Sequence, residues 1–182
     1  MPGTKTVVIS DIHVSDGAPY SWFTASCSDR LIAMLDMVVN DPEVGELVLL
    51  GDIFDLWLYP VDVAPLTVGA ILDKNPQVAT ALRACVAAKS AVYYINGNHD
   101  SEATTADLAD PRLTSDGKQI KVITTDWYKQ NCNSKWHFEH GHEADMFNAP
   151  DDSDETIGGY PLGYFITRLA ATPRSQSSHM TR

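Results

Sequence analysis

The feature that most constrains the fold is an alternation of short apolar runs with longer segments of helical spacing. The runs at residues 4–10, 46–50 and 91–95 are rich in aliphatic and aromatic residues, which predicts three strands. Residues 27–39 and 78–89 place their apolar side chains three or four apart, which predicts two helices. Strand, helix, strand, helix, strand is typical of a parallel or mixed sheet that is covered by helices. The first half of the chain therefore predicts a domain of the α/β class.

Each predicted strand stops at a short polar motif. The motifs are DIH at residues 11–13, GD at residues 51–52 and GNHD at residues 97–100. In open α/β sheets, ligands bind outside the carboxyl ends of the strands. Because the same arrangement recurs at three successive strand ends, these motifs are expected to meet in one site.

The second half of the chain has a weaker pattern. Strands are predicted over residues 119–125 and 135–140, as a pair joined around residues 131–134. A helix is predicted over residues 164–171. Residues 172–182 form a polar tail that is expected to stay unfolded, so the domain is assigned to residues 1–171.

The net charge argues against two classes of partner. Thirteen basic residues against 24 acidic ones give a formal net charge of −11. Strong binding to a nucleic-acid backbone or to an anionic membrane surface needs basic patches, which this composition does not favour. A small phosphorylated substrate remains compatible with this charge, provided that bound metal ions supply positive charge locally. No pattern in the sequence indicates an oligomeric state.

The cysteines and the N-terminal sequence indicate a cytoplasmic protein. Cys27, Cys85 and Cys132 have no spacing typical of a metal site, and they are expected to be reduced thiols. The N-terminal sequence MPGTKTVVISDIH lacks the apolar run of a signal peptide. No apolar stretch approaches the ~20 residues that a membrane-spanning helix needs.

The first two motifs carry groups that bind divalent ions. Asp11 and His13 are two residues apart, so in an extended backbone both side chains would project to the same side and could grip one ion. Asp52 follows a glycine, which lets the chain turn sharply after its strand. Each also has an ordinary alternative: Asp52, for example, could simply cap a helix or a turn.

The GNHD motif adds an amide and an imidazole. The amide oxygen of Asn98 suits a hard metal ion without adding negative charge. His99 could donate a proton beside the metal site. Asp55 lies three residues after the GD motif and could orient this imidazole.

Three histidines in the second half of the chain differ in their expected roles. His140 and His142 follow a predicted strand on either side of a glycine and are further candidate ligands. His137 alternates with aromatic residues and is expected to face solvent or a partner strand. Substrate specificity is assigned to loops around residues 20–23, 57–63 and 145–160.

Together the motifs resemble those of the calcineurin-like metallophosphoesterases. The similarity covers about residues 4–148 and consists of DxH, GD with a second aspartate three residues later, GNHD and a later HG. The segment GDIFDLW is similar to that of UDP-2,3-diacylglucosamine hydrolases and their relatives. Those enzymes usually carry arginine at the position of His99, which is closer to the phosphodiesterase and phosphatase branches.

The resemblance implies a four-layer α/β fold, in which helices flank a central β-sandwich of mixed sheets and the metal site lies at the carboxyl ends of strands. It also implies two divalent metal ions, with Mn²⁺ favoured over Fe, Zn or Mg. Asp11 and His13 would hold one ion, Asn98 and His140 would hold the other, and Asp52 would bridge both.

The implied reaction is hydrolysis of phosphate mono- or diesters, or of a nucleotide pyrophosphate. A hydroxide between the two ions would attack phosphorus in line. His99, oriented by Asp55, would protonate the leaving oxygen or stabilise the transition state.

One motif of the family is missing. The family closes its metal site with a C-terminal GHxH, whose histidines complete the two metal spheres, and no GHxH occurs in this sequence. Three explanations stay open: the chain is a truncated form, His142 and Asp145 take the place of those histidines, or the metal centre is incomplete. An incomplete centre would favour another class of function, a phosphoesterase-like scaffold that acts as a binding module.

Overall fold

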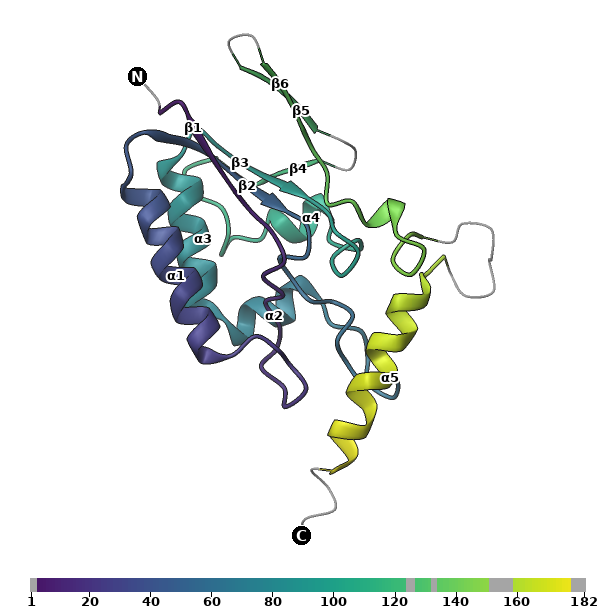
Figure 1. Ribbon diagram of the computed structural model, residues 1–182. Coiled ribbons are helices and arrows are strands. Elements are labelled where there is room, and N and C mark those ends of the chain that lie inside the picture. Colours follow the sequence, from purple (N-terminus) through teal and green to yellow (C-terminus); the bar gives the residue numbers. More distant parts are fainter. Residues whose placement is uncertain (1–2, 124–126, 132–133, 151–158, 178–182) are drawn as a thin grey trace.

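Four parallel strands form the main sheet, and they lie side by side in the order in which they occur in the chain. The computed structural model describes residues 3–123, 127–131, 134–150 and 159–177 (Figure 1). The strands of this sheet are β1 (Lys5–Ile9), β2 (Val44–Leu50), β3 (Ala91–Ile95) and β4 (Lys121–Ile123). The three strands expected in the first half of the chain are therefore present.

Helices connect these strands and cover the sheet. They are α1 (Ala25–Asn40), α2 (Val68–Lys74), α3 (Pro76–Ala88) and the short α4 (Thr105–Leu108). Local chemistry explains where they begin: the Thr24 hydroxyl accepts the N–H of Cys27 at the start of α1, and Pro76 occupies the first turn of α3. α2 was not predicted from the sequence, because its seven residues are too few to give a periodic pattern.

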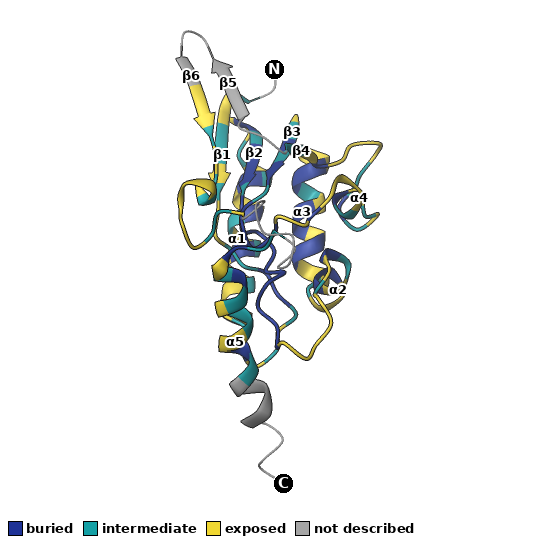
Figure 2. Cartoon of the chain, turned by 90° about the vertical axis from the view of Figure 1, so that its right-hand side faces the viewer, coloured by how far each residue is buried: buried dark blue, intermediate teal, exposed yellow. Residues whose placement is uncertain are grey.

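The core lies between the sheet and the pair α1 and α3. Leu35 of α1 and Leu82 of α3 pack in one buried cluster with alternate residues of the strands, among them Leu47 and Tyr94. The loop after β2 is buried as thoroughly as the strands, because every residue from 51 to 60 is inaccessible (Figure 2). A loop buried in this way is held by specific contacts, and these contacts build the site described below.

The predicted strand pair in the second half of the chain is wrong in its partners. β4 joins the main sheet parallel to β3. The partner of β6 (Ser134–Phe138) is instead β5 (Trp127–Asn131), in an antiparallel hairpin. Because a short run such as KVI fits either edge, its pairing depends on the neighbouring strand and cannot be read from local pattern.

The remaining elements are a short 3-10 helix, η1 (His142–Ala144), and α5 (Leu162–Ser177). The expectation of an unfolded tail from residue 172 is wrong as far as Ser177, because α5 continues to that residue. A contact with the segment that follows the buried loop holds the helix there: the Thr172 hydroxyl accepts the N–H of Val61 at 3.2 Å. The division into a domain over residues 1–171 and a tail over residues 172–182 remains a prediction.

The α/β class is confirmed. The main sheet is parallel throughout rather than mixed, and the second sheet has two strands within the described residues. Among the helices of the described residues, none has the length and apolar character needed to cross a membrane.

Candidate metal centre

Backbone hydrogen bonds bring the ends of β1, β2 and β3 together. The N–H of Asp11 donates to the carbonyl of Gly51 at 3.2 Å, and the N–H of Gly51 donates to the carbonyl of Ile95 at 2.7 Å. Beyond these contacts, a parallel bridge between Val14 and Phe54 continues the pairing of the first two strands into their loops. The polar motifs therefore meet at the carboxyl edge of the sheet, as expected for open α/β sheets.

Three candidate ligands adopt a left-handed backbone conformation. The φ angles are 55° at Asp11, 55° at His13 and 54° at Asp52. The extended geometry that the sequence analysis assumed for the DIH motif is therefore wrong. A left-handed conformation costs about 1–3 kcal/mol for a residue with a side chain, and such strain concentrates at functional sites.

Two glycines make room for the candidate ligands. A Cβ at Gly51, where φ is 73°, would overlap the imidazole of His140. A Cβ at Gly97 would overlap the carboxylate of Asp52. Each motif therefore needs its glycine for a close approach of side chain to backbone.

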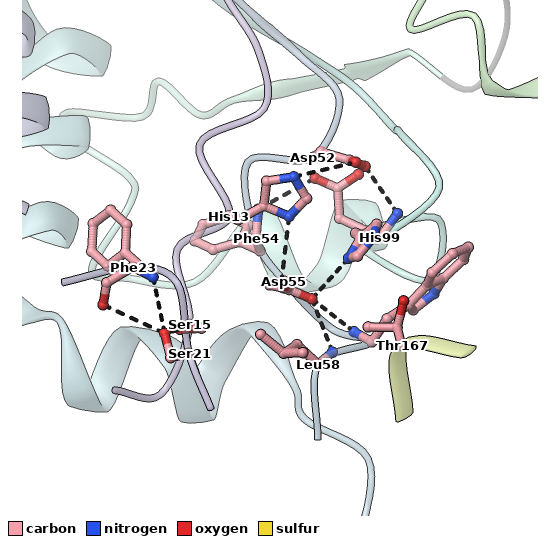
Figure 3. A network of polar contacts seen from close by, with 12 residues as sticks. His13, Ser15, Ser21, Phe23, Asp52, Phe54, Asp55, Leu58, His99 and Thr167 are labelled. Atoms are coloured by element: carbon pink, nitrogen blue, oxygen red, sulfur yellow. Dashed lines mark hydrogen bonds and ion pairs between the residues drawn. The ribbon is translucent and has the colours of Figure 1, made fainter. Parts of the chain in front are cut away.

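Asp52 lies at the centre of the site (Figure 3). Its side chain is buried, and its Oδ1 accepts the N–H of His99 at 2.9 Å. Its Oδ2 lies 3.7 Å from Nε2 of His13 and 3.4 Å from Nε2 of His140. Burial alone would raise the pKa of Asp52. The hydrogen bond from His140 and the charges of His99 and His140 outweigh that effect and hold the pKa below its usual range.

His140 contributes a nitrogen that faces only acceptors. Its Nδ1 lies 3.2 Å from the carbonyl oxygen of Leu50, which can only accept, so Nδ1 carries the proton of that hydrogen bond. Its Nε2 then faces Oδ1 of Asn98 at 3.2 Å as well as the Asp52 carboxylate at 3.4 Å. The hydrogen bond with Asp52 raises the pKa of His140 to about 9. This corner therefore attracts a cation, either a proton on Nε2 or a metal ion.

Asp55 organises the other side of the site. Its Oδ1 accepts the backbone N–H groups of Trp57 at 3.2 Å and Leu58 at 3.0 Å, and it lies 2.9 Å from Nδ1 of His99. Its Oδ2 lies 3.4 Å from Nδ1 of His13. Although burial would raise the pKa of Asp55, the contacts with the imidazoles of His13 and His99 hold it well below its usual range. Asp55 is therefore ionised and fixed in place.

The donor groups fit a divalent ion. Within the described residues, His13, Asp52 and His99 form one group whose ligand-type atoms lie within 4.8 Å of one another, and Asp11, Asp52 and His140 form a second such group. Asp52 belongs to both groups. Nδ1 of His13 and Oδ2 of Asp55 are buried 3.4 Å apart, and neither has a hydrogen bond. Imidazole nitrogens with carboxylate and amide oxygens suit Mn²⁺, Zn²⁺ and Fe²⁺.

The two groups divide the ligands differently from the implied pairing. Asp11 lies with His140 rather than with His13, and His13 lies with His99. His99 was assigned to proton transfer, but its position beside His13 and Asp52 would also allow it to bind a metal ion.

The residues considered as substitutes for the missing motif lie apart from these groups. His142 is adjacent to the site, with its ring centroid 5.5 Å from that of His140, but within the described residues it joins neither group. Asp145 is exposed, and its carboxylate accepts the N–H of Phe147 at 2.7 Å. His137 is exposed beside Glu139, in agreement with the expected solvent-facing position.

Sequence reasoning missed the role of Asp100. This side chain is fully buried and accepts the N–H groups of Ile53 at 2.8 Å and Gly97 at 2.6 Å, together with the hydroxyl of Tyr94. It therefore ties the loop after β2 to the loop after β3. The signal was its place in the GNHD motif, where a fourth polar residue follows the candidate ligands.

Two cavities open beside the site. The smaller one has a volume of about 280 Å³ and is lined in part by Trp57, Asn98 and His142. The larger one, of about 760 Å³, includes His140 and His142 in its lining. Both are lined by Ser101, Glu102 and Pro150. Trp57, Pro150 and Tyr160 come from two of the loops to which specificity was assigned.

The chain also matches the model of a known protein family. The family model of the calcineurin-like phosphoesterases matches residues 4–169. No curated protein matches the chain.

Proposed function

Because the chain belongs to the calcineurin-like phosphoesterase family, we propose that it hydrolyses phosphate mono- or diesters with the help of two divalent metal ions. The observation that carries this proposal is the position of Asp52, whose carboxylate belongs to both groups of ligand-type atoms. A carboxylate between two groups of donors suits a pair of ions.

The proposed ligands are the side chains that converge on Asp52. They are Asp11, His13, Asp52, Asn98 and His140, with His142 as a further candidate. Mn²⁺ is the favoured ion, and Fe, Zn and Mg are the alternatives. Bound ions would act as Lewis acids that neutralise phosphoryl oxygens and activate water.

We assign the handling of the leaving-group proton to His99. The contact between Asp55 and Nδ1 of His99, at 2.9 Å, orients the ring and leaves Nε2 as the nitrogen that can give up a proton. Asp55 also accepts two backbone N–H groups, so this orientation does not depend on a mobile side chain.

Charge around the cavities favours esters with a single phosphate. The described lining residues include Glu102, Glu139 and Glu143 but no lysine or arginine. A second phosphate on the substrate would meet these carboxylates without a protein cation to pair with. We therefore favour simple mono- and diesters over a nucleotide pyrophosphate.

The decisive experiment compares metal content and activity. With Mn²⁺ supplied, the protein should cleave nitrophenyl phosphate or its bis-ester, and a chelator shown to strip the metal should abolish cleavage. Asp52→Asn should lose both metal and activity. Asp116→Asn is the matched control, since Asp116 has a similar φ of 50° in an exposed turn. Activity that persists in metal-free protein would contradict the proposal.

The second candidate is a binding scaffold without catalysis, and the missing GHxH is the observation that favours it. The same experiment separates the two. A protein that binds Mn²⁺ through Asp52 but turns over neither ester would be a scaffold.

Three substitutions test the division of roles. His99→Gln should keep the metal and lower turnover by about 10²–10⁴-fold, the range for general acid–base groups. Asp55→Asn should give a smaller loss in the same direction. His140→Ala should lower metal occupancy, and excess Mn²⁺ should partly restore it. The measurements are metal stoichiometry and kcat. If His99→Gln lost metal as severely as His140→Ala, His99 would be a ligand.

A further inference from the structure

A stack of aromatic rings connects α5 to His99. The indole of Trp57 lies face to face with the His99 imidazole, with ring centroids 4.7 Å apart and an angle of 28° between planes. The ring of Tyr164, on α5, meets the indole edge-on at 5.6 Å and 83°. Trp57 is 1% exposed and Tyr164 is 6% exposed, so the stack is closed to solvent.

Polar contacts fix Tyr164 against the loop that carries Trp57. The hydroxyls of Tyr164 and Tyr59 are 2.8 Å apart and share a hydrogen bond. The guanidinium of Arg168, one turn further along α5, lies 4.3 Å from the ring centre of Tyr59. Arg168 also donates from Nη2 to the carbonyls of Pro60 at 3.2 Å and Val61 at 3.0 Å. Helix and loop are therefore held together at several points.

Trp57 supplies a constraint on His99 that Asp55 does not. A single hydrogen bond to Nδ1 fixes one direction and leaves the imidazole able to turn about the line joining the two groups. A flat surface against the ring face removes that rotation. The ring of His13 meets the His99 imidazole edge-on, with centroids 4.6 Å apart and an angle of 90° between planes. The imidazole therefore has one stacked neighbour and one edge-on neighbour.

We propose that Trp57, held in place by Tyr164 and Arg168 of α5, is a positioning residue that sets the orientation of the His99 ring. The inference rests on the proposed function, in which His99 delivers a proton to the leaving oxygen. It adds that a helix far from the motifs in sequence controls this step through ring contacts.

The first test uses leaving groups of different basicity. Trp57→Leu and Tyr164→Leu should lower kcat for an alkyl phosphate by about 10–10²-fold, since small displacements of a catalytic group have effects of that size. The loss should be several-fold smaller for a nitrophenyl ester, whose leaving group needs no proton. In Tyr164→Leu, whose side chain lines neither cavity, KM and metal stoichiometry should stay unchanged. Tyr164→Phe, which keeps the ring but not the hydroxyl, should recover most of the rate.

The second test asks whether the effect passes through His99. In a His99→Gln background, Trp57→Leu should cause no further loss, because residues that act as a unit are not additive. Leu169→Ala is the control on α5, because Leu169 is 61% exposed on the same helix. Equal losses for good and poor leaving groups, or additive losses with His99→Gln, would overturn the proposal.

The third test does not depend on activity. Nitrogen and proton NMR of the His99 ring should show shifted or broadened signals in Trp57→Leu and Arg168→Met, and unchanged signals in Leu169→Ala. Arg168→Met preserves the buried Trp57 and so covers the case in which Trp57→Leu unfolds. Unchanged His99 signals in both variants would overturn the proposal. If the wild-type protein cleaved neither ester, the proposed function would fail, and the NMR result would still decide this inference.

Discussion

Asp100 holds two loops of the site together from a buried position behind the proposed ligands. Its carboxylate accepts the N–H groups of Ile53, Phe54 and Gly97, together with the hydroxyl of Tyr94 on β3. The three N–H groups come from the loops after β2 and β3. These loops carry Asp52 and Asn98, so the spacing of two proposed ligands depends on one buried acid. Burial raises the pKa of Asp100. The protein therefore tolerates an unfavourable carboxylate here because no neutral side chain of that size accepts as many hydrogen bonds.

Asp100→Asn should accordingly destabilise the fold. The amide nitrogen cannot accept, so at least one buried N–H or hydroxyl loses its partner, and the expected loss is about 2–4 kcal/mol of unfolding free energy. Urea denaturation measures it. Asp116→Asn, at an exposed position, should change the stability by less than ~0.5 kcal/mol. Equal stabilities for the two variants would show that the Asp100 network is not structural.

The two described cysteines should differ sharply in reactivity. Cys27 is exposed, and the hydrogen bond with the Thr24 side chain lowers its pKa. Cys85 is fully buried, and burial raises its pKa to about 11. In a Cys132→Ser chain at pH 8, a thiol reagent should label Cys27 rapidly, whereas Cys85 should react only on unfolding. Fast labelling of Cys85 in the native protein would contradict the burial of α3.

Among the elements, the strand-to-loop junctions carry the chemistry, and the strands themselves carry the stability. The strands supply the apolar residues of the sheet. The residues that directly follow β1 and β2, by contrast, include several with a left-handed backbone, and they form hydrogen bonds with the neighbouring loop. Such loops are stable only because the strand ends hold them on both sides. Strained backbone persists only where the surrounding structure holds it, and here the rigid sheet provides that support.

Two glycine substitutions separate strain from steric overlap at this edge. Gly51 and Gly117 have φ angles of 73° and 77°, but only at Gly51 would a Cβ overlap another group, the ring of His140. Gly117→Ala should cost about 1 kcal/mol through backbone strain alone. Gly51→Ala should cost more, and it should also weaken Mn²⁺ binding by displacing the imidazole. Thermal unfolding and calorimetric titration measure both effects. Equal metal affinities would mean that His140 is not a ligand.

At the scale of the whole molecule, metal binding should be coupled to folding. The ligands come from the ends of separate strands, so an ion bound at Asp52 holds distant parts of the chain together. Mn²⁺ at a free concentration of 100 times its dissociation constant adds about 2.7 kcal/mol to the free energy of unfolding. For a chain of 182 residues, that corresponds to a Tm increase of roughly 5–10 °C. Thermal scans with Mn²⁺ and with chelator should show this difference. His140→Ala should reduce it, and an unchanged Tm would argue against the site.

Sequence alone predicts the part of this molecule that depends on local pattern. The strands up to β3 and the helices α1 and α3 are readable because apolar spacing records which face is buried, whereas the short α2 is not. The convergence of Asp11, Asp52 and Asn98 follows from parallel strands. The pairing of β4 and of the β5–β6 hairpin is not readable, because short runs fit several partners. The contact of Trp57 with Tyr164 is equally hidden, since it joins residues more than a hundred positions apart that no local rule relates.

The left-handed backbone at Asp11, His13 and Asp52 also shapes how this protein can change over generations. Asparagine tolerates that conformation as well as aspartate does, and it differs from aspartate by a single nucleotide change. β-Branched residues at the same positions would strain the backbone and destabilise the fold, so selection for a folded protein would remove them. Drift at Asp11 and Asp52 is therefore channelled toward asparagine, a replacement that keeps the architecture while weakening the hold on a cation. Lineages with this backbone can lose their chemistry long before they lose their shape.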